Sequence, residues 1–330
     1  MRIPSFWAEA RFVGSCRGLE RVIRRFGWSD ESQQQAQHHA DERALAAVAE
    51  FESGRRVRAR DRKLRYGDEV LPIREEVLAR NGDDVVTRNV YGARCLNEPD
   101  VFFADIDHEY LLPVGTERLF GELLRILGLG PLLAAPALFW FGHFGTGIAV
   151  ALGAWTAAVL LLLLRTRLRA APANHEAERR RARERVDAFV AAPPGARVAV
   201  YATPNGLRLL ALHRTFDPLG DEVAAMFAQL RADTAYARLC RLQGCFRARV
   251  SAKPWRIGLG RMAPHCLWPV PFEQLGERED WVAEYETKAA GYAACRFVET
   301  LGDGALHPRC AAVQKVHDEL CRAHSDLPIA

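Results

Sequence analysis

Several common signals are missing from this sequence. It has no Cys-x-x-Cys pair, no Walker A glycine loop and no Gly-x-Ser-x-Gly nucleophile elbow. Zinc-ribbon, P-loop and α/β-hydrolase chemistry therefore have no motif to support them. The N-terminal residues contain no apolar core long enough for a secretory signal peptide, so we expect the eight cysteines to be reduced thiols on the cytoplasmic side.

Lysine is also scarce, because nearly all basic residues are arginine, which fits a GC-rich bacterial source. The formal net charge is only +4, so the charge balance alone does not indicate a nucleic-acid or membrane-surface binder. With 49% hydrophobic and 26% charged residues, the composition is that of a folded protein. A chain of 330 residues has room for two domains, or for one domain with a large insertion.

Charge is absent altogether between Arg125 and Arg165. A single helix over this run would measure about 58 Å, roughly twice the hydrocarbon thickness of a bilayer. The glycines at 142, 145 and 147 offer a break in its middle. The pattern predicts a transmembrane hairpin inserted at 119–170, with spans at about 126–142 and 146–164.

Basic residues flank this predicted hairpin on both sides, and its tip has none. By the positive-inside tendency, the expected location is the bacterial inner membrane, multi-pass, with both termini cytoplasmic and the lipid bilayer as a partner. The alternative is a helical hairpin buried in a soluble core. Pro131 and Pro136 weaken the first span, whereas the leucine run at 160–164 followed by arginines favours the membrane.

On either side of the hairpin the pattern alternates between strands and helices. Residues 1–100 are expected to form an N-terminal α+β lobe, with short strands at 5–14 and 20–28 and then a helix that runs to about Glu52. Residues 261–330 are expected to form a C-terminal helical region. Residues 101–118 and 171–260 predict a core with the order strand, helix, strand, strand, helix, strand. This order is the split βαβ of ferredoxin-like and RRM-like domains, so the predicted fold class is α+β. The predicted core elements are 101–107, 175–192, 196–203, 207–215, 219–232 and 245–251.

Two carboxylates, Asp105 and Asp107, end the most hydrophobic predicted strand. Residues i and i+2 of a strand point to the same face, so these side chains should project together. Paired carboxylate oxygens suit Mg²⁺ or Mn²⁺, particularly where the ion also binds phosphate. The alternative is structural: Asp107 starts a turn, and Asp105 pairs with one of the many arginines.

The strand ending in Asp-x-Asp on an RRM-like core resembles the archaeo-eukaryotic primase (primase-polymerase) superfamily. A second motif of that family, a small residue, any residue and then His, is matched by Ala211-Leu212-His213 after the turn at Pro204-Asn205-Gly206. Some branches also carry an acid, basic residues, a glycine turn and a lysine. The similar positions here are Asp233, Arg238, Arg241, Gly244 and Lys253.

The resemblance implies metal-dependent nucleotidyl transfer. Asp105 and Asp107 would bind the divalent metals, and the catalytic residues would be His213 and Asp233, with Asp233 as the third acid and His213 on the phosphates of the nucleotide. The residues expected to contact nucleotide or nucleic acid are Arg208, Arg241, Arg247, Arg249 and Lys253.

Alternatives to these assignments stay open. The basic segment around Arg247 and Arg249, with Trp255 among its cations, suits phosphate and base contacts, but the same cations are equally suited to pairing with acids or lipid headgroups. Cys240 and Cys245, with His265 and Cys266 downstream, are a less favoured zinc set, because their spacing is not that of a zinc ribbon. The competing function is a membrane-tethered interaction module without catalysis.

Overall fold

The computed structural model describes residues 1–61, 72–107, 155, 172–192 and 194–330. These residues form an α+β fold with one two-stranded and two four-stranded antiparallel sheets. The chain divides into two compact units, one made of residues 1–107 and 185–330 and the other of residues 108–184. All residues of the candidate site belong to the first unit.

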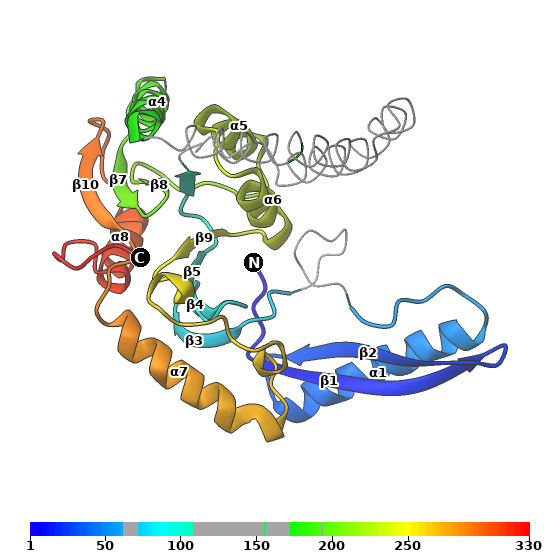
Figure 1. Cartoon of the computed structure of the whole chain (residues 1–330). Coiled ribbons are helices and arrows are strands. Elements are labelled where there is room, and N and C mark those ends of the chain that lie inside the picture. The colour runs from blue at the N-terminus through cyan, green and yellow to red at the C-terminus, as the bar shows by residue number, and fades with distance from the viewer. Residues whose placement is uncertain (62–71, 108–154, 156–171, 193) are drawn as a thin grey trace, which may run out of the picture. The chain divides into compact units, whose positions relative to one another are not determined.

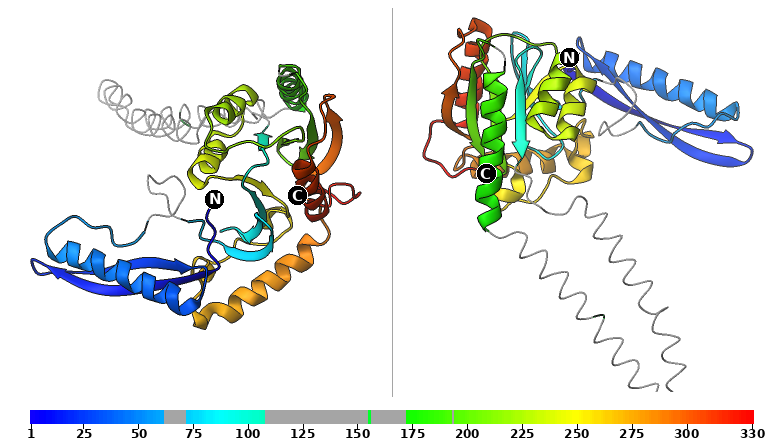
Figure 2. Two further views of the ribbon diagram at one scale, coloured as in Figure 1. Left: turned by 180° about the vertical axis from the view of Figure 1, so that it is seen from behind. Right: turned by 90° about the horizontal axis from the view of Figure 1, so that it is seen from above.

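The N-terminal hairpin pairs β1 (Phe6–Cys16) with β2 (Leu19–Ser29) in register from end to end. The two residues between them, Arg17 and Gly18, both have positive φ, as a tight two-residue hairpin turn requires. Helix α1 (Gln33–Glu52) lies along this hairpin, as Figures 1 and 2 show. It begins at the N-cap Ser32, whose hydroxyl accepts from the backbone N–H of Gln35 at 3.1 Å.

Small residues let α1 approach the hairpin closely. Ala36, Ala40 and Ala44 are spaced four residues apart and are fully buried. On the hairpin, a Cβ added at Gly27 would lie 2.1 Å from the backbone nitrogen of Ala40. Any residue larger than glycine at position 27 would therefore push the helix away from the sheet.

Two four-stranded sheets make up the rest of the first unit. The first has the order β3-β4-β5-β9, and the second has the order β10-β7-β8-β6. The strands of the first are β3 (Glu76–Asn81), β4 (Asp84–Arg88), β5 (Arg94–Glu98) and β9 (Phe246–Arg249). Those of the second are β6 (Phe103–Asp107), β7 (Val198–Thr203), β8 (Gly206–Ala211) and β10 (Arg296–Leu301).

Helices connect these strands. The α-helices after α1 are α4 (Pro172–Ala191), α5 (Asp221–Leu230), α6 (Thr234–Gln243), α7 (Leu275–Ala289) and α8 (Pro308–Cys321). Short 3₁₀ helices are η1 (Pro254–Arg256), η2 (Pro264–Cys266) and η3 (Phe272–Gln274).

An aromatic core holds the strand that carries both predicted metal-binding carboxylates. Phe102, which immediately precedes β6, is fully buried. Its ring centroid lies 5.1 to 6.4 Å from those of Phe189, Phe216, Phe227 and Phe246. Rings at these separations add contact energy beyond the burial of their area.

The tertiary structure differs from the predicted core at two strands. Strand β9 pairs with β5 in the other sheet rather than completing the sheet of β6, β7 and β8. The place beside β7 is taken by β10, which lies within the region 261–330 expected to be helical. Half-buried and exposed residues alternate along β10, as on an edge strand, and six such residues are too few to show their period clearly in sequence.

The predicted transmembrane hairpin is not supported, and that prediction is corrected. Among the residues that the structure describes, no helix combines the length and the apolar character needed to cross a bilayer. The predicted spans at 126–142 and 146–164 lie outside the described residues, apart from Trp155. An uncharged run is a feature of composition, whereas a span also requires a continuous apolar helix of about 20 residues. The inner-membrane location, the orientation of the termini and the bilayer partner, all predicted from this run, are withdrawn with it.

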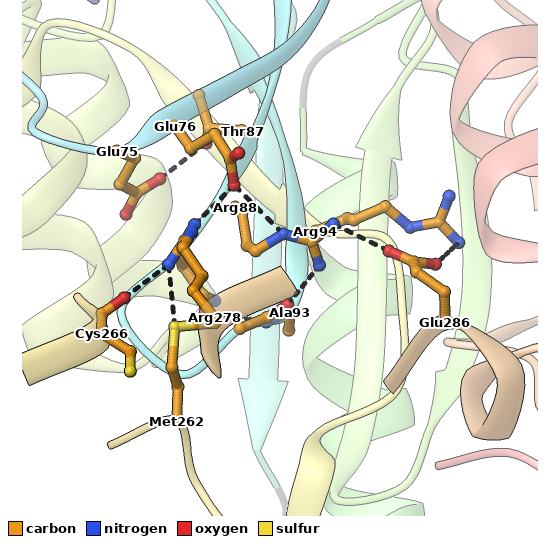
Figure 3. A network of polar contacts seen from close by, with 12 residues as sticks. Glu75, Glu76, Thr87, Arg88, Ala93, Arg94, Met262, Cys266, Arg278 and Glu286 are labelled. Carbon is orange, nitrogen blue, oxygen red and sulfur yellow. Dashed lines mark hydrogen bonds and ion pairs between the residues drawn. The ribbon is translucent and has the colours of Figure 1, made fainter. Parts of the chain in front are cut away.

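A buried network of charges ties α7 and η2 to the first four-stranded sheet (Figure 3). Arg278 of α7 donates to Glu76 Oε2 at 2.5 Å and to the carbonyl oxygen of Cys266 at 2.7 Å. Arg88 of β4 lies between Glu76, at 3.3 Å, and Glu286 of α7, at 2.9 Å. Both arginines are about 95% buried and share Glu76, so removing either one leaves that carboxylate with one cationic partner instead of two.

Arg278→Ala is expected to lower the free energy of unfolding by about 2–3 kcal/mol, because it removes charge-assisted hydrogen bonds from buried acceptors. Urea denaturation followed by circular dichroism measures this change. Lys288→Ala is the matched control on the same helix: its ion pair with Glu284 is exposed, so the expected loss is about 0.5 kcal/mol or less. Equal losses in the two variants would show that the buried network stabilises the fold no more than an exposed ion pair does.

Candidate functional site

Asp105 forms a bidentate ion pair with Arg208. The two residues lie directly opposite each other on β6 and β8. Arg208 Nε donates to Asp105 Oδ1 at 2.7 Å, and Nη2 donates to Oδ2 at 3.0 Å. Burial alone would raise the pKa of Asp105, but the Arg208 guanidinium outweighs it and holds that pKa below its usual value. Both oxygens of Asp105 are thus engaged by an arginine, as in the structural alternative.

Asp107 and Asp233 form an acidic pair at the end of β6. The backbone N–H of Asp233 donates to the carbonyl oxygen of Asp105 at 3.5 Å, so the start of α6 lies against the strand. Asp233 Oδ1 caps α6 by accepting from the N–H of Ala235 at 2.8 Å. The pKa of Asp107 is raised, first by partial burial and then by the negative charges of Asp105 and Asp233. A cation beside Asp107 would relieve this repulsion.

Basic residues from the segment around η1 face the same carboxylates. Lys253, which precedes η1, and Arg256, which ends it, both act to lower the pKa of Asp107. The pKa of Lys253 is itself lowered, first by burial and then by the positive charges of Arg249 and Arg256. Arg256 Nη2 also donates to Asn205 Oδ1, in the turn between β7 and β8, at 2.7 Å.

We call Asp107, Asp233, Lys253 and Arg256 the acidic–basic cluster. Trp255, between its two cations in sequence, is 42% exposed, and the Lys253 ammonium lies 5.6 Å from its ring centroid. Two carboxylates beside two cations and an exposed aromatic ring provide groups for a metal ion, for phosphate oxygens and for a flat ring.

His213 lies away from the acidic–basic cluster. Strand β8 runs from Gly206, which pairs with Asp107, to Ala211, and His213 follows its far end. Its Nδ1 lies 3.2 Å from the backbone nitrogen and 3.1 Å from the carbonyl oxygen of Arg197. The structure thus brings Asp105, Asp107 and Asp233 together and leaves His213 at the other end of the sheet.

The predicted phosphate-binding arginines are divided in the same way. Arg208 is 1% exposed and its guanidinium is committed to Asp105 and to the carbonyl oxygen of Arg249. Arg247 is 8% exposed and donates to Glu75 Oε2 at 2.5 Å, so it serves the buried interior of the first four-stranded sheet. Arg249 Nη1 donates to the carbonyl oxygen of Ser251, and Arg241 is an exposed residue in the last turn of α6. Of the basic residues named from the sequence, Lys253 is the one that lies in the acidic–basic cluster.

Metal-ligand geometry is found elsewhere in the described part of the chain. There, two groups of three side chains place their ligand atoms within 4.8 Å of one another: Cys295 with His317 and Cys321, and His265 with Cys266 and Glu277. The carboxylates of β6 and α6 do not form such a group, and neither do Cys240 and Cys245 with His265 and Cys266. Arg208 engages both oxygens of Asp105, so Asp105 does not fit as a metal ligand, and Asp107 and Asp233 are the exposed carboxylates that remain available at this end of β6.

Sequence reasoning missed the Cys295, His317 and Cys321 group. His317 and Cys321 are four residues apart, which puts them on one face of a helix, and this was the available signal. Cys295 reaches them only through the fold. A pocket of about 560 Å³ is lined by residues of β1, α1 and the segment 269–274, and none of the predicted site residues lines it.

The fold and site together define an α+β protein with an acidic–basic cluster at the end of β6, an edge strand of the second four-stranded sheet. Comparison with protein-family models, with curated proteins and with solved structures found no match. The function of this chain is therefore inferred from its own residues and their contacts.

Proposed function

We propose that this protein binds the phosphate groups of a nucleotide or nucleic acid at the acidic–basic cluster. The observation that carries the proposal is the arrangement itself: the start of α6 with Asp233 lies against the end of β6, and Lys253 and Arg256 of the η1 segment face Asp107 there, whose raised pKa reflects partial burial and the neighbouring carboxylates. Asp107 and Asp233 would hold Mg²⁺ or Mn²⁺, and this ion would neutralise phosphate charge. Lys253 and Arg256 would contact the remaining phosphate oxygens.

Trp255 supports a nucleotide over a bare phosphate. Its indole is 42% exposed, and large aromatic side chains at that exposure next to cations are the usual platform for base stacking. Arg261 lies 4.9 Å from the same ring and adds positive charge on that side. A base stacked on Trp255 would leave its phosphates within reach of Lys253.

The finer proposal, from the resemblance to the primase superfamily, is metal-dependent nucleotidyl transfer. Such a reaction depends on positioning and on charge neutralisation, which the acidic–basic cluster is suited to supply. Asp105 would act as a positioning residue, because its ion pair with Arg208 fixes the end of β6. His213 has no part in this proposal, since it lies at the far end of β8.

A second candidate function is that of an interaction module without catalysis. The Arg208–Asp105 ion pair favours it, because the first carboxylate of Asp-x-Asp is already neutralised by a buried arginine. In that case the acidic–basic cluster would be an exposed surface for a protein partner.

Asp107→Ala is expected to weaken the Mn²⁺-dependent binding of a non-hydrolysable nucleoside triphosphate at least tenfold. Titration calorimetry on the full chain measures this change in affinity. Stability should be unchanged or slightly higher, because like-charge repulsion is removed. Lys253→Ala should weaken triphosphate binding but leave Mn²⁺ binding intact.

Matched controls are Asp303→Ala and Lys315→Ala. Asp303 is an exposed residue after β10, on the opposite edge of the sheet from β6, and Lys315 is exposed on α8. Both should bind like the wild type. If the folded wild type binds neither Mn²⁺ nor triphosphate, the phosphate-binding proposal is wrong and the interaction module is favoured.

A further inference from the structure

Three soft or borderline metal ligands converge in the interior, next to Arg208 of the Asp105–Arg208 ion pair and separate from the residues of the acidic–basic cluster. Cys295 directly precedes β10, and His317 and Cys321 lie on one face of α8. Each of the three is at most 1% exposed. His317 Nε2 lies 3.4 Å from Cys321 Sγ and 3.9 Å from Cys295 Sγ.

These separations are those of ligands around a zinc ion. Bonds of about 2.3 Å to sulfur and about 2.0–2.1 Å to nitrogen, at tetrahedral angles, place the sulfur and nitrogen ligands about 3.6 Å apart. The two observed S···N distances lie on either side of this value. Little movement of the side chains would therefore be needed to accept the ion.

The imidazole of His317 is already oriented for ligation. Its Nδ1 lies 3.0 Å from Asp318 Oδ1, which fixes the ring with Nε2 turned toward both thiols. A carboxylate behind the non-ligating nitrogen is the usual support of a zinc-bound histidine. Asp318 is itself held by His324, whose Nε2 lies 3.0 Å from Asp318 Oδ2.

We propose that Cys295, His317 and Cys321 bind a zinc ion that fastens β10 to α8. Two thiolates would cancel the charge of the ion, so that a fully buried site carries no net charge. Arg208 Nη1 lies 3.4 Å from His317 Nε2, but its positive charge is already paired with Asp105. Three protein ligands leave the fourth position of the tetrahedron to a water molecule. This proposal is independent of nucleotide binding.

The first test measures zinc on the full wild-type chain. The chain is stripped with a chelator under reducing conditions and then titrated with Zn²⁺ against a chromogenic competitor, and Co²⁺ is used as a spectroscopic probe. We expect one buried equivalent per chain, thiolate-to-cobalt charge-transfer bands, and a higher melting temperature with Zn²⁺. Absence of zinc binding, or cobalt binding without thiolate bands, would overturn the proposal whatever the variants do.

The variants locate the site. Cys321→Ser should lose the bound equivalent and its thermal stabilisation, and Asp318→Asn should weaken zinc affinity by about 10–100-fold. Cys310→Ser is the matched control, because Cys310 is equally buried on the same helix but its thiol contacts the carbonyl oxygen of Arg214. All are made in a His265→Ala background, which removes the exposed group of His265, Cys266 and Glu277. Equal zinc binding by Cys321→Ser and Cys310→Ser would overturn the assignment.

Discussion

Arg208→Met is expected to lower the free energy of unfolding by about 3 kcal/mol. Removing one partner of a buried ion pair usually costs about 3–5 kcal/mol, and this loss should lie at the lower end of that range. Methionine keeps most of the volume but leaves the Asp105 carboxylate and the carbonyl oxygen of Arg249 without their donor. The lower end applies because the Asp105 side chain is 33% exposed and can recover some hydration. Denaturant unfolding at neutral pH measures the loss.

A double-mutant cycle separates the pair from its surroundings. Asp105→Asn with Arg208→Met should be more stable than Arg208→Met alone, because no unpaired charge then remains. Arg214→Met is the surface control: its ion pair with Glu222 has side chains 47% and 59% exposed, so its loss should be below about 1 kcal/mol. Additive effects of the two substitutions in the Asp105–Arg208 cycle would mean that the ion pair does not couple them energetically.

Glu98→Gln is expected to remove a large pH dependence of stability. Glu98, at the end of β5, is fully buried, and its pKa is raised to about 9, first by burial and then by the neighbouring Asp84 carboxylate. Arg309 of α8 acts in the opposite direction by donating to Glu98 Oε2 at 2.9 Å, and it is shared with Asp84 and Asp100.

The direction of the pH dependence follows from the pKa of Glu98 in the unfolded chain and its higher pKa in the folded protein. Below about pH 4.5 Glu98 is protonated in both states, and above about pH 9 it is ionised in both. Between these values the unfolded chain loses the proton while the folded protein keeps it. The free energy of unfolding therefore falls as the pH rises, by up to about 1.4 kcal/mol per pH unit for one proton.

Glutamine mimics the protonated carboxyl, so Glu98→Gln should unfold like the wild type near pH 4.5 and be the more stable protein near pH 9. Denaturant midpoints across this range give the comparison. Glu279→Gln, at an exposed position on α7, should follow the wild-type curve throughout. A Glu98→Gln curve parallel to that of the wild type would show that Glu98 is ionised in the folded protein at neutral pH.

Local sequence patterns predicted much of the secondary structure. The short strands expected at 5–14 and 20–28 are observed at 6–16 and 19–29, and the helix expected to run to Glu52 ends there. These elements depend on alternation, on helical spacing and on turn residues, all of which act over a few neighbours.

Of the candidate site, the sequence predicted the carboxylates but not their different surroundings. Asp105 and Asp107 are equivalent as a motif, yet one is paired with Arg208 and the other faces Lys253 and Arg256. Arg208 is 103 residues from Asp105 in the chain, and only the register of β6 against β8 sets them opposite each other. His213 matches the second motif of the primase superfamily, but it follows the end of β8 that lies farthest from Asp107.

By itself, the sequence determined the kinds of charge and thiol available, the strand that ends in Asp-Ile-Asp, and the local starts and ends of its helices and strands. Only the tertiary structure decided that β9 pairs with β5, that β10 joins β7, and that Cys295 meets His317 and Cys321. Strand partners and long-range side-chain contacts depend on which pairing buries the most apolar surface while satisfying its polar groups. That choice is made by the whole fold, and no local window of residues contains it.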